Sequence, residues 1–253
     1  MPAQPAVPGS EPPPPPAVDL WWFDTRAEAV RPADAAVMDP GERQRARTLL
    51  SASDRHRFEV AHVMLRRVLA GYLGAGPGEL SFGRERCPRC GRAPGRPVLL
   101  PGHWAGRRAT PWFSLARSGD LVLIAVAGRP VGADLERDRA GCVCPLTGVL
   151  HPGDAAALAA LTEPDRHRAV IGCWVRAEAV LKCTGEGIAH GLTGLRLRPP
   201  RAGPGAGASA QVRRVRGCSV RGLAAPPGYQ AALALAGPGP VIPRAMAVPA
   251  GPG

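Results

Sequence analysis

Residues 174–187 read W-V-R-A-E-A-V-L-K-C-T-G-E-G, a pattern typical of a helix that ends in a glycine turn. Trp174, Glu178 and Lys182 are spaced i, i+4 and i+8, so their side chains project from nearly the same helical face. A carboxylate, an ammonium and an indole on one face are unusual for a purely structural stripe. This face is therefore a candidate wall of a site that binds phosphate and a metal ion.

A second group of acids lies on a predicted hairpin. One strand is expected at 121–127, and V-G-A-D-L-E follows at 131–136 after a Gly-Arg-Pro turn. Asp134 and Glu136 are two residues apart on the return strand, so they share one face of it. Adjacent carboxylates repel each other. From spacing alone, this pair fits either a solvent-facing strand end or the oxygen ligands of a divalent cation.

Composition limits the classes of partner. The chain has 253 residues, 45% of them hydrophobic, and a formal net charge of +12. That charge permits a nucleic acid, an anionic membrane surface, a polyanionic cofactor or an acidic protein. Lys182 is the only lysine, so arginine carries almost all of the positive charge. Arginine favours bidentate phosphate contacts, although a proteome-wide preference for arginine would produce the same composition.

The sequence predicts a cytoplasmic protein with reduced thiols. Its cysteines number seven, an odd count, and no secretory signal pattern follows Met1. The longest apolar run, 121–127, is too short to span a membrane. We therefore expect no membrane association.

Two lobes are expected between two Pro/Gly-rich tails. The predicted segments are a disordered tail at 1–17, an N-terminal lobe at 18–128, a C-terminal lobe at 129–236 and a disordered tail at 237–253. Each lobe interleaves short strands, one of them expected at 192–197, with one long helix. The first long helix is expected to be capped by Ser53 and closed by Gly74. This predicts an α+β fold of two similar lobes in a pseudo-two-fold arrangement, each a small sheet packed with a long helix.

Three motifs, in this order, resemble those of the 4'-phosphopantetheinyl transferases of the Sfp type. The chain reads F-S-L-A-R-S-G-D at 113–120, followed by the motifs at 131–136 and 174–187. The family shows F-(N/S)-(I/L)-S-H-S-G-D, then (V/I)-G-(V/I)-D-x-E, then W-x-x-K-E-A-x-x-K-x-x-G-x-G. The second and third motifs together are highly specific, and the resemblance covers residues 18–235.

The resemblance implies an activity and a cofactor. The enzyme would transfer 4'-phosphopantetheine from coenzyme A to a serine of an apo acyl or peptidyl carrier protein, and 3',5'-ADP would leave. Mg²⁺, with Mn²⁺ as the alternative, would be held by Asp134, Glu136 and Glu178. Glu178 would also be the candidate base, and Lys182 would contact the phosphates. Because one chain holds both lobes, a monomer is expected to be complete.

Several positions are assigned to coenzyme A by the same resemblance. They are Arg47, Arg57, Arg96, Pro97, Arg117 and Ser118. Arg57 and Arg47 would serve the 3'-phosphate, Arg47 as the looser match, and Arg96 with Pro97 would lie near the adenine. Arg117 stands where relatives have a histidine that contacts the 3'-phosphate, and arginine supplies a permanent charge there.

The chain also departs from the family pattern. Ala116 replaces a serine, and Ala177 replaces a lysine beside Glu178. These changes predict an altered grip on coenzyme A, or else a relative that has lost activity and acts as a coenzyme A-binding or partner protein. A basic nucleic-acid-binding protein is the rival from another class. No helix-turn-helix, finger or RNP motif supports it.

The segment Cys87-Pro-Arg-Cys90-Gly91 resembles half of a zinc knuckle. Cys142 and Cys144 are candidates for the other half. That pair is C-x-C and lies about 50 residues away, whereas four-cysteine sites usually use two C-x-x-C pairs. We interpret the first pair as a loop feature rather than a zinc site.

Overall fold

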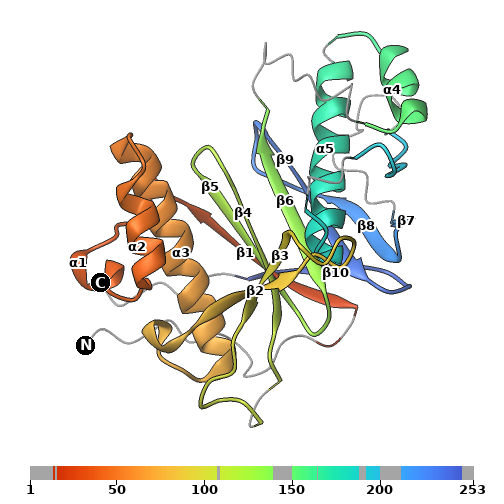
Figure 1. Cartoon of the computed structure of the whole chain (residues 1–253). Coiled ribbons are helices and arrows are strands. Elements are labelled where there is room, and N and C mark those ends of the chain that lie inside the picture. Colours follow the sequence, from red (N-terminus) through yellow and green to blue (C-terminus); the bar gives the residue numbers. More distant parts are fainter. Residues whose placement is uncertain are drawn as a thin grey trace. The chain divides into compact units, whose positions relative to one another are not determined.

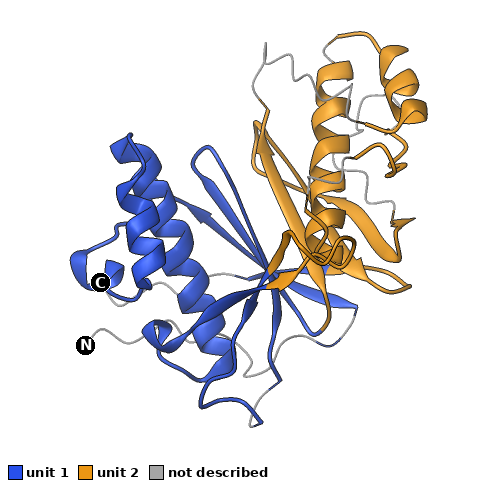
Figure 2. Ribbon diagram, viewed as in Figure 1, with its two compact units in different colours: residues 1–84, 97–128, 243–253 blue, residues 85–96, 129–242 orange. Residues whose placement is uncertain are grey.

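The computed structural model describes residues 14, 16–106, 109–138, 150–163, 165–187, 192–199 and 212–246. The chain divides into two compact units (Figure 2). Unit 1 comprises 1–84, 97–128 and 243–253, and unit 2 comprises 85–96 and 129–242. Cys142 and Cys144 lie outside the described residues.

Unit 1 is built on a four-stranded sheet of order β10-β1-β5-β4 (Figure 1). The strands are β1 (Ala17–Asp24), β4 (Trp112–Ser118), β5 (Leu121–Ala127) and β10 (Ile242–Met246), and the helices are α1 (Pro32–Ala35), α2 (Pro40–Arg47), α3 (Ala52–Leu73) and the 3₁₀ turn η1 (Pro77–Glu79). β5 pairs antiparallel with both β1 and β4. One face of α3 joins the sheet in a single apolar core. Gly74 ends α3 with φ 62°, a conformation that favours glycine.

A buried polar network joins the two ends of the unit 1 sequence. The Asp19 carboxylate on β1 is fully buried. Its Oδ1 lies 2.6 Å from Arg244 Nη2 on β10, and its Oδ2 accepts a hydrogen bond of 2.7 Å from the Tyr72 hydroxyl. Burial and the hydrogen bond to Asp19 raise the pKa of Tyr72, so this hydroxyl stays a donor. Arg244 therefore supplies the positive charge that a buried carboxylate requires.

Strands β2 (Phe82–Arg86) and β3 (Pro94–Leu99) form a separate two-stranded hairpin. The boundary between the units passes through this hairpin, so its tip, 85–96, clusters with unit 2. The sequence had predicted that segment for the N-terminal lobe. Local sequence cannot reveal the assignment, because it depends on contacts made with residues almost ninety positions later.

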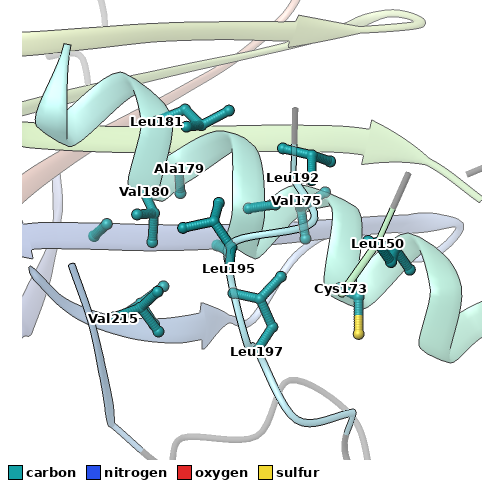
Figure 3. Packing of buried hydrophobic residues seen from close by; sticks show 14 of the residues in the cluster. Leu150, Cys173, Val175, Ala179, Val180, Leu181, Leu192, Leu195, Leu197 and Val215 are labelled. Atoms are coloured by element: carbon teal, nitrogen blue, oxygen red, sulfur yellow. The ribbon is translucent and has the colours of Figure 1, made fainter. Parts of the chain in front are cut away.

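Unit 2 is an antiparallel sheet of order β6-β9-β8-β7 with one long helix against it (Figure 1). The strands are β6 (Val131–Arg137), β7 (Arg213–Val215), β8 (Cys218–Leu223) and β9 (Tyr229–Ala236), and the helices are α4 (Pro152–Ala159) and α5 (Asp165–Thr184). Side chains of α5 meet leucines of the 192–199 segment in the core (Figure 3). The fold is thus α+β, as predicted. The pseudo-two-fold relation between the lobes stays a prediction.

Three local predictions are wrong. The segment 237–253 was expected to be disordered, yet it contains β10, which pairs with β1. Leu192–Leu197 was expected as a strand but has no regular structure; its leucines are buried, and the Asp154 carboxylate accepts the backbone N–H groups of Leu197 and Arg198. The cap of α3 is Ser51, whose Oγ accepts the N–H of Asp54, rather than Ser53.

The length and the apolar character of a helix together decide whether it could cross a membrane. Across the described parts of the chain, no helix has both the length and the apolar character needed to cross a bilayer.

The Asp19 network predicts a stability effect at the C-terminal strand. We expect Arg244→Ala to lower the free energy of unfolding by about 1–3 kcal/mol, because Asp19 keeps the Tyr72 hydroxyl but loses its cation. Denaturant unfolding followed by circular dichroism measures the change. Arg45→Ala, which removes an exposed arginine from α2, is the matched control and should stay within about 0.5 kcal/mol of wild type. Equal stability of the two variants would show that β10 does not depend on this pair.

Candidate functional site

Helix α5 is buried on almost every side. Between Ala169 and Cys183 the half-exposed positions are Trp174, Glu178 and Lys182, and every other residue is buried. The helical face predicted from the sequence is therefore the one open stripe of this part of the helix. Trp174 packs against the unit 2 core, which accounts for its indole without any ligand. Glu178 and Lys182 are left as the reactive side chains of the stripe.

Gly132 lets β6 approach the backbone of α5 directly. A Cβ at this position would lie 2.0 Å from the Ala179 carbonyl oxygen and 2.4 Å from the Cys183 nitrogen, both backbone atoms. No side chain fits into that space. The glycine of V-G-A-D-L-E thus sets the distance between the strand that carries Asp134 and the helix that carries Lys182.

Lys182 is bonded to β6 across this close contact. Its Nζ donates to Asp134 Oδ1 at 2.7 Å and to the Ala133 carbonyl oxygen at 3.1 Å. Asp134 is buried, whereas the Lys182 side chain is 31% exposed. The ammonium therefore reaches a buried carboxylate from the open side of the site.

Two carboxyl groups of the site are short of positive charge. Burial raises the pKa of Asp134, although the neighbouring Lys182 opposes that effect. Burial also raises the pKa of Glu178, and the negative charges of Asp134 and Glu136 raise it further. Within the described part of the chain, Asp134 Oδ2 and Glu178 Oε1 are buried and have no hydrogen-bond partner. Such oxygens destabilise the site unless a cation or a donor reaches them.

These oxygens fit a hard divalent cation by their chemistry. Mg²⁺ prefers carboxylate oxygen and commonly takes its remaining ligands from water and phosphate. The carboxylates do not form a ready-made ligand cluster, however. Among the residues that the structure describes, no three His, Cys, Asp or Glu side chains are grouped so that they could hold a metal ion. Lys182 is bonded to Asp134 Oδ1, an oxygen that a cation would also use.

Arg96 binds the C-terminal end of α5. Its Nη1 donates to the Cys183 carbonyl oxygen at 2.5 Å, and its Nε donates to Glu85 at 2.8 Å. The last carbonyls of a helix lack partners within the helix, and a cation is favoured there. This is a structural contact at a position predicted to lie near adenine. Pro97 follows Arg96 in β3.

A second group of predicted residues gathers in unit 1. Arg57 pairs with Asp120 at 2.7 Å and with Asp54 at 3.0 Å. The Arg117 guanidinium lies over the Phe58 ring, 5.7 Å from its centroid. Arg57 and Arg117 are thus linked through neighbouring residues at the start of α3 and the end of β4.

The other unit 1 positions differ in their surroundings. Ser118 ends β4 beside Arg117, and Arg47 is exposed as the last residue of α2, a different helix. Asp120 was absent from the predicted site residues, although it closes the F-S-L-A-R-S-G-D motif. The sequence signal that could have identified Asp120 was its place at the end of this motif, three residues after Arg117.

Both alanines that depart from the family pattern are buried. Ala116 lies within β4, where it pairs in register with Leu123. Ala177 belongs to the apolar core of unit 2 and has no exposed surface. A lysine at 177 would have to carry its ammonium out of this core. The missing charge is therefore not a simple loss from an open surface.

Comparison with known proteins finds a family that this part of the chain resembles. Residues 130–234 match the family described as the 4'-phosphopantetheinyl transferase superfamily. That range contains β6 and α5, with Asp134, Glu178 and Lys182. This stretch of the chain is thus similar to that superfamily, and the match does not distinguish its subtypes.

Individual proteins of the same description are also similar to this chain. The chain is 31% identical over 161 residues to the 4'-phosphopantetheinyl transferase HetI of Nostoc sp., a match that covers 61% of this chain and 62% of that protein. It is 23% identical over 163 residues to a 4'-phosphopantetheinyl transferase of Bacillus subtilis, covering 64% of this chain and 67% of the relative. The chain therefore matches less than two thirds of the length of the Nostoc relative.

The contact at Gly132 predicts a large cost for a single methyl group. We expect Gly132→Ala to lower the free energy of unfolding by about 3 kcal/mol or more, because the new Cβ meets backbone atoms that cannot move aside separately. Denaturant unfolding measures the loss. Gly187→Ala is the matched control, since its Cβ would meet nothing nearer than 4.0 Å, and it should stay within about 0.5 kcal/mol of wild type. A stable Gly132→Ala protein would mean that β6 and α5 can separate without cost.

Proposed function

We propose that this protein transfers 4'-phosphopantetheine from coenzyme A to a serine of an apo acyl or peptidyl carrier protein, with release of 3',5'-ADP. The observation that carries the proposal is the group formed by Asp134, Glu178 and Lys182, where two carboxyl groups and an ammonium interact inside the stretch that matches the superfamily. The sequence motifs at 113–120, 131–136 and 174–187 favour the Sfp type.

Lys182 is proposed to bind and orient the phosphate oxygens. Its ammonium has 31% of the side chain exposed and is held at 2.7 Å from Asp134 Oδ1, so its position is fixed before a substrate arrives. A fixed cation that faces developing negative charge stabilises a phosphoryl transfer without having to reorganise. The bond to the Ala133 carbonyl oxygen limits the ammonium further.

Glu178 is proposed to accept the proton of the attacking serine hydroxyl at Oε1. This oxygen has no hydrogen-bond partner among the described residues. Burial and two neighbouring carboxylates raise the pKa of Glu178, which makes its ionised form a stronger base than an exposed glutamate. The Glu178 side chain lies on the half-exposed stripe of α5, from which a substrate hydroxyl would have to reach the buried Oε1.

Asp134, Glu136 and Glu178 are the residues that would hold Mg²⁺, or Mn²⁺ in its place. Bound there, the ion would neutralise charge on the pyrophosphate of coenzyme A. The unpartnered Oδ2 of Asp134 supports this assignment, since a cation would satisfy it.

The 3'-phosphate of coenzyme A is proposed to bind Arg117 and Arg57, with Ser118 and Arg47 as further contacts. Arg117 is exposed, and its contact with the face of the Phe58 ring leaves its N–H groups available. Arg57 is already paired with Asp120 and Asp54, so a phosphate would compete with two carboxylates for it. Arg117 is therefore the stronger candidate, while Arg96 and Pro97 would contribute through the β2–β3 hairpin.

A relative without transfer activity that still binds coenzyme A is the second candidate. The buried alanines at 116 and 177 favour it, because both stand where the family has polar side chains. A cytoplasmic monomer stays a prediction under either proposal.

The proposed roles predict loss of transfer in two conservative variants. Incubation with coenzyme A, Mg²⁺ and a panel of apo acyl and peptidyl carriers should add one phosphopantetheine mass to a carrier. Asp134→Asn and Glu178→Gln should each lower the rate by at least about 100-fold, because they remove a metal ligand or the base while keeping the side-chain shape. Glu163→Gln, an exposed acid just before α5, is the matched control and should keep the wild-type rate.

A thermal shift separates these roles from damage to the fold. Mg²⁺ should raise the melting temperature of the wild-type protein and have little effect on Asp134→Asn or Glu178→Gln, because a ligand stabilises the state that binds it. Wild-type transfer rates in both variants would contradict the site assignment. Binding of coenzyme A without transfer to any carrier would favour the second candidate.

The proposed 3'-phosphate contact can be tested with a matched ligand. Arg117→Ala should weaken coenzyme A binding by about 10-fold or more, the loss expected for one charge-assisted hydrogen bond. It should leave binding of 3'-dephospho-coenzyme A unchanged. Titration calorimetry measures both constants. Equal losses for the two ligands would place Arg117 away from the 3'-phosphate.

A further inference from the structure

The tip of the β2–β3 hairpin holds two cysteines in a closed turn. The Cys87 N–H donates to the Ala93 carbonyl oxygen at 2.9 Å, and the Gly91 N–H donates back to the Cys87 carbonyl oxygen at 2.8 Å. Gly91 has φ 68°, a left-handed conformation that a tight reversal requires. The turn therefore holds Cys87 and Cys90 on the same short loop, and their side chains are hydrogen-bonded.

The surroundings of Cys90 favour its thiolate. The Ala93 N–H donates to Cys90 Sγ at 3.4 Å. Backbone hydrogen bonds from Ala93 and Arg92, followed by the bond with Cys87, lower the pKa of Cys90. The side chain is half-buried, whereas Cys87 is fully buried. One sulfur is thus accessible and activated, and the second lies behind it.

The other described cysteines give a contrast within the same chain. Cys183 and Cys218 also form a pair, with their sulfur atoms 3.2 Å apart, but both are buried. The hydrogen bond with Cys218, together with burial, raises the pKa of Cys183. Burial raises the pKa of Cys173 to about 12. The bond with Cys183 lowers the pKa of Cys218, but the Cys218 side chain is buried and shielded from solvent, so proximity and a lowered pKa do not by themselves make a thiol reactive.

We propose that Cys87 and Cys90 form a redox-active dithiol that peroxide oxidises to a disulfide, with Cys90 as the nucleophile and Cys87 as the resolving thiol. The Cys90 thiolate attacks one oxygen of hydrogen peroxide, the O–O bond breaks, and the departing hydroxide takes a proton to give water. The Cys87 thiol then loses its proton and attacks the Cys90 sulfenic sulfur, and the S–O bond breaks with release of a second water. The dithiol loses two electrons, and peroxide gains them.

The position of the turn gives this chemistry a route to α5. Arg89, between the two cysteines, lies 3.9 Å from Glu186, just after the helix. Further along the same hairpin, Arg96 donates to the Cys183 carbonyl oxygen next to Lys182. A change in the covalent state of the turn therefore acts on the helix end. The inference itself concerns the thiols and does not rest on the proposed function.

The test uses the full chain after reduction and removal of the reductant. Limiting hydrogen peroxide is added, free thiols are alkylated, and peptides are identified by mass spectrometry. We expect a disulfide between Cys87 and Cys90, with oxidation at Cys90 about 10-fold faster or more than at Cys183. Cys87→Ser should accumulate a Cys90 sulfenic acid that dimedone traps, Cys90→Ser should leave Cys87 unreacted, and Cys218→Ser, the control, should react as wild type does.

Several results would overturn the inference. They are equal oxidation rates at Cys90 and Cys183, a disulfide that joins Cys87 or Cys90 to Cys142 or Cys144, or a stoichiometric zinc ion in the purified protein that Cys90→Ser loses. The wild-type peptide map decides the first two without any variant, so an unfolded variant does not block the test. Loss of transfer activity alone leaves the inference intact.

Discussion

The backbone of β6 touches the backbone of α5 at Gly132, and the candidate site depends on this contact. A lysine side chain has a fixed reach, so Lys182 can bond Asp134 and the Ala133 carbonyl oxygen only if strand and helix lie this close. The sheet and the leucines of 192–197 bury the other faces of α5, so the face with Glu178 and Lys182 is the one left open. Gly132 has no reactive side chain, yet it positions Asp134 and Lys182 relative to each other.

Charge at this site runs against the charge of the whole chain. The protein carries a net +12, yet burial and mutual repulsion raise the pKa values of Asp134 and Glu178. Lys182 is the cation bonded to Asp134, and it leaves two carboxyl oxygens unsatisfied. Among the described residues, the site is thus locally deficient in positive charge, inside a strongly basic protein.

Sequence patterns within short segments predicted the features of the fold that interactions between near neighbours determine. Helical spacing identified the open stripe of α5, and Gly185, with φ 79°, follows the helix as predicted. Alternation identified the face of Asp134 and Glu136. The errors have the opposite origin. β10 lies within a Pro/Gly-rich segment, and its Arg244 binds Asp19, more than two hundred residues earlier. The leucines at 192–197 are buried without strand pairing, and Asp154 accepts the N–H groups of Leu197 and Arg198. Contacts between distant segments leave no periodic signal in the sequence.

Arg96 shows why a motif match does not by itself define a binding residue. In a chain with so many arginines, a basic side chain at a motif position is common, and what separates candidates is whether their N–H groups are already used. Arg96 donates hydrogen bonds to Glu85 and to the end of α5, and Arg57 is paired with two carboxylates. Arg117 instead contacts the face of an aromatic ring, an attraction that consumes no donor. For a phosphate ligand, the arginine bound by the weakest competitor gains most on binding, because a new hydrogen bond there replaces water rather than an existing ion pair.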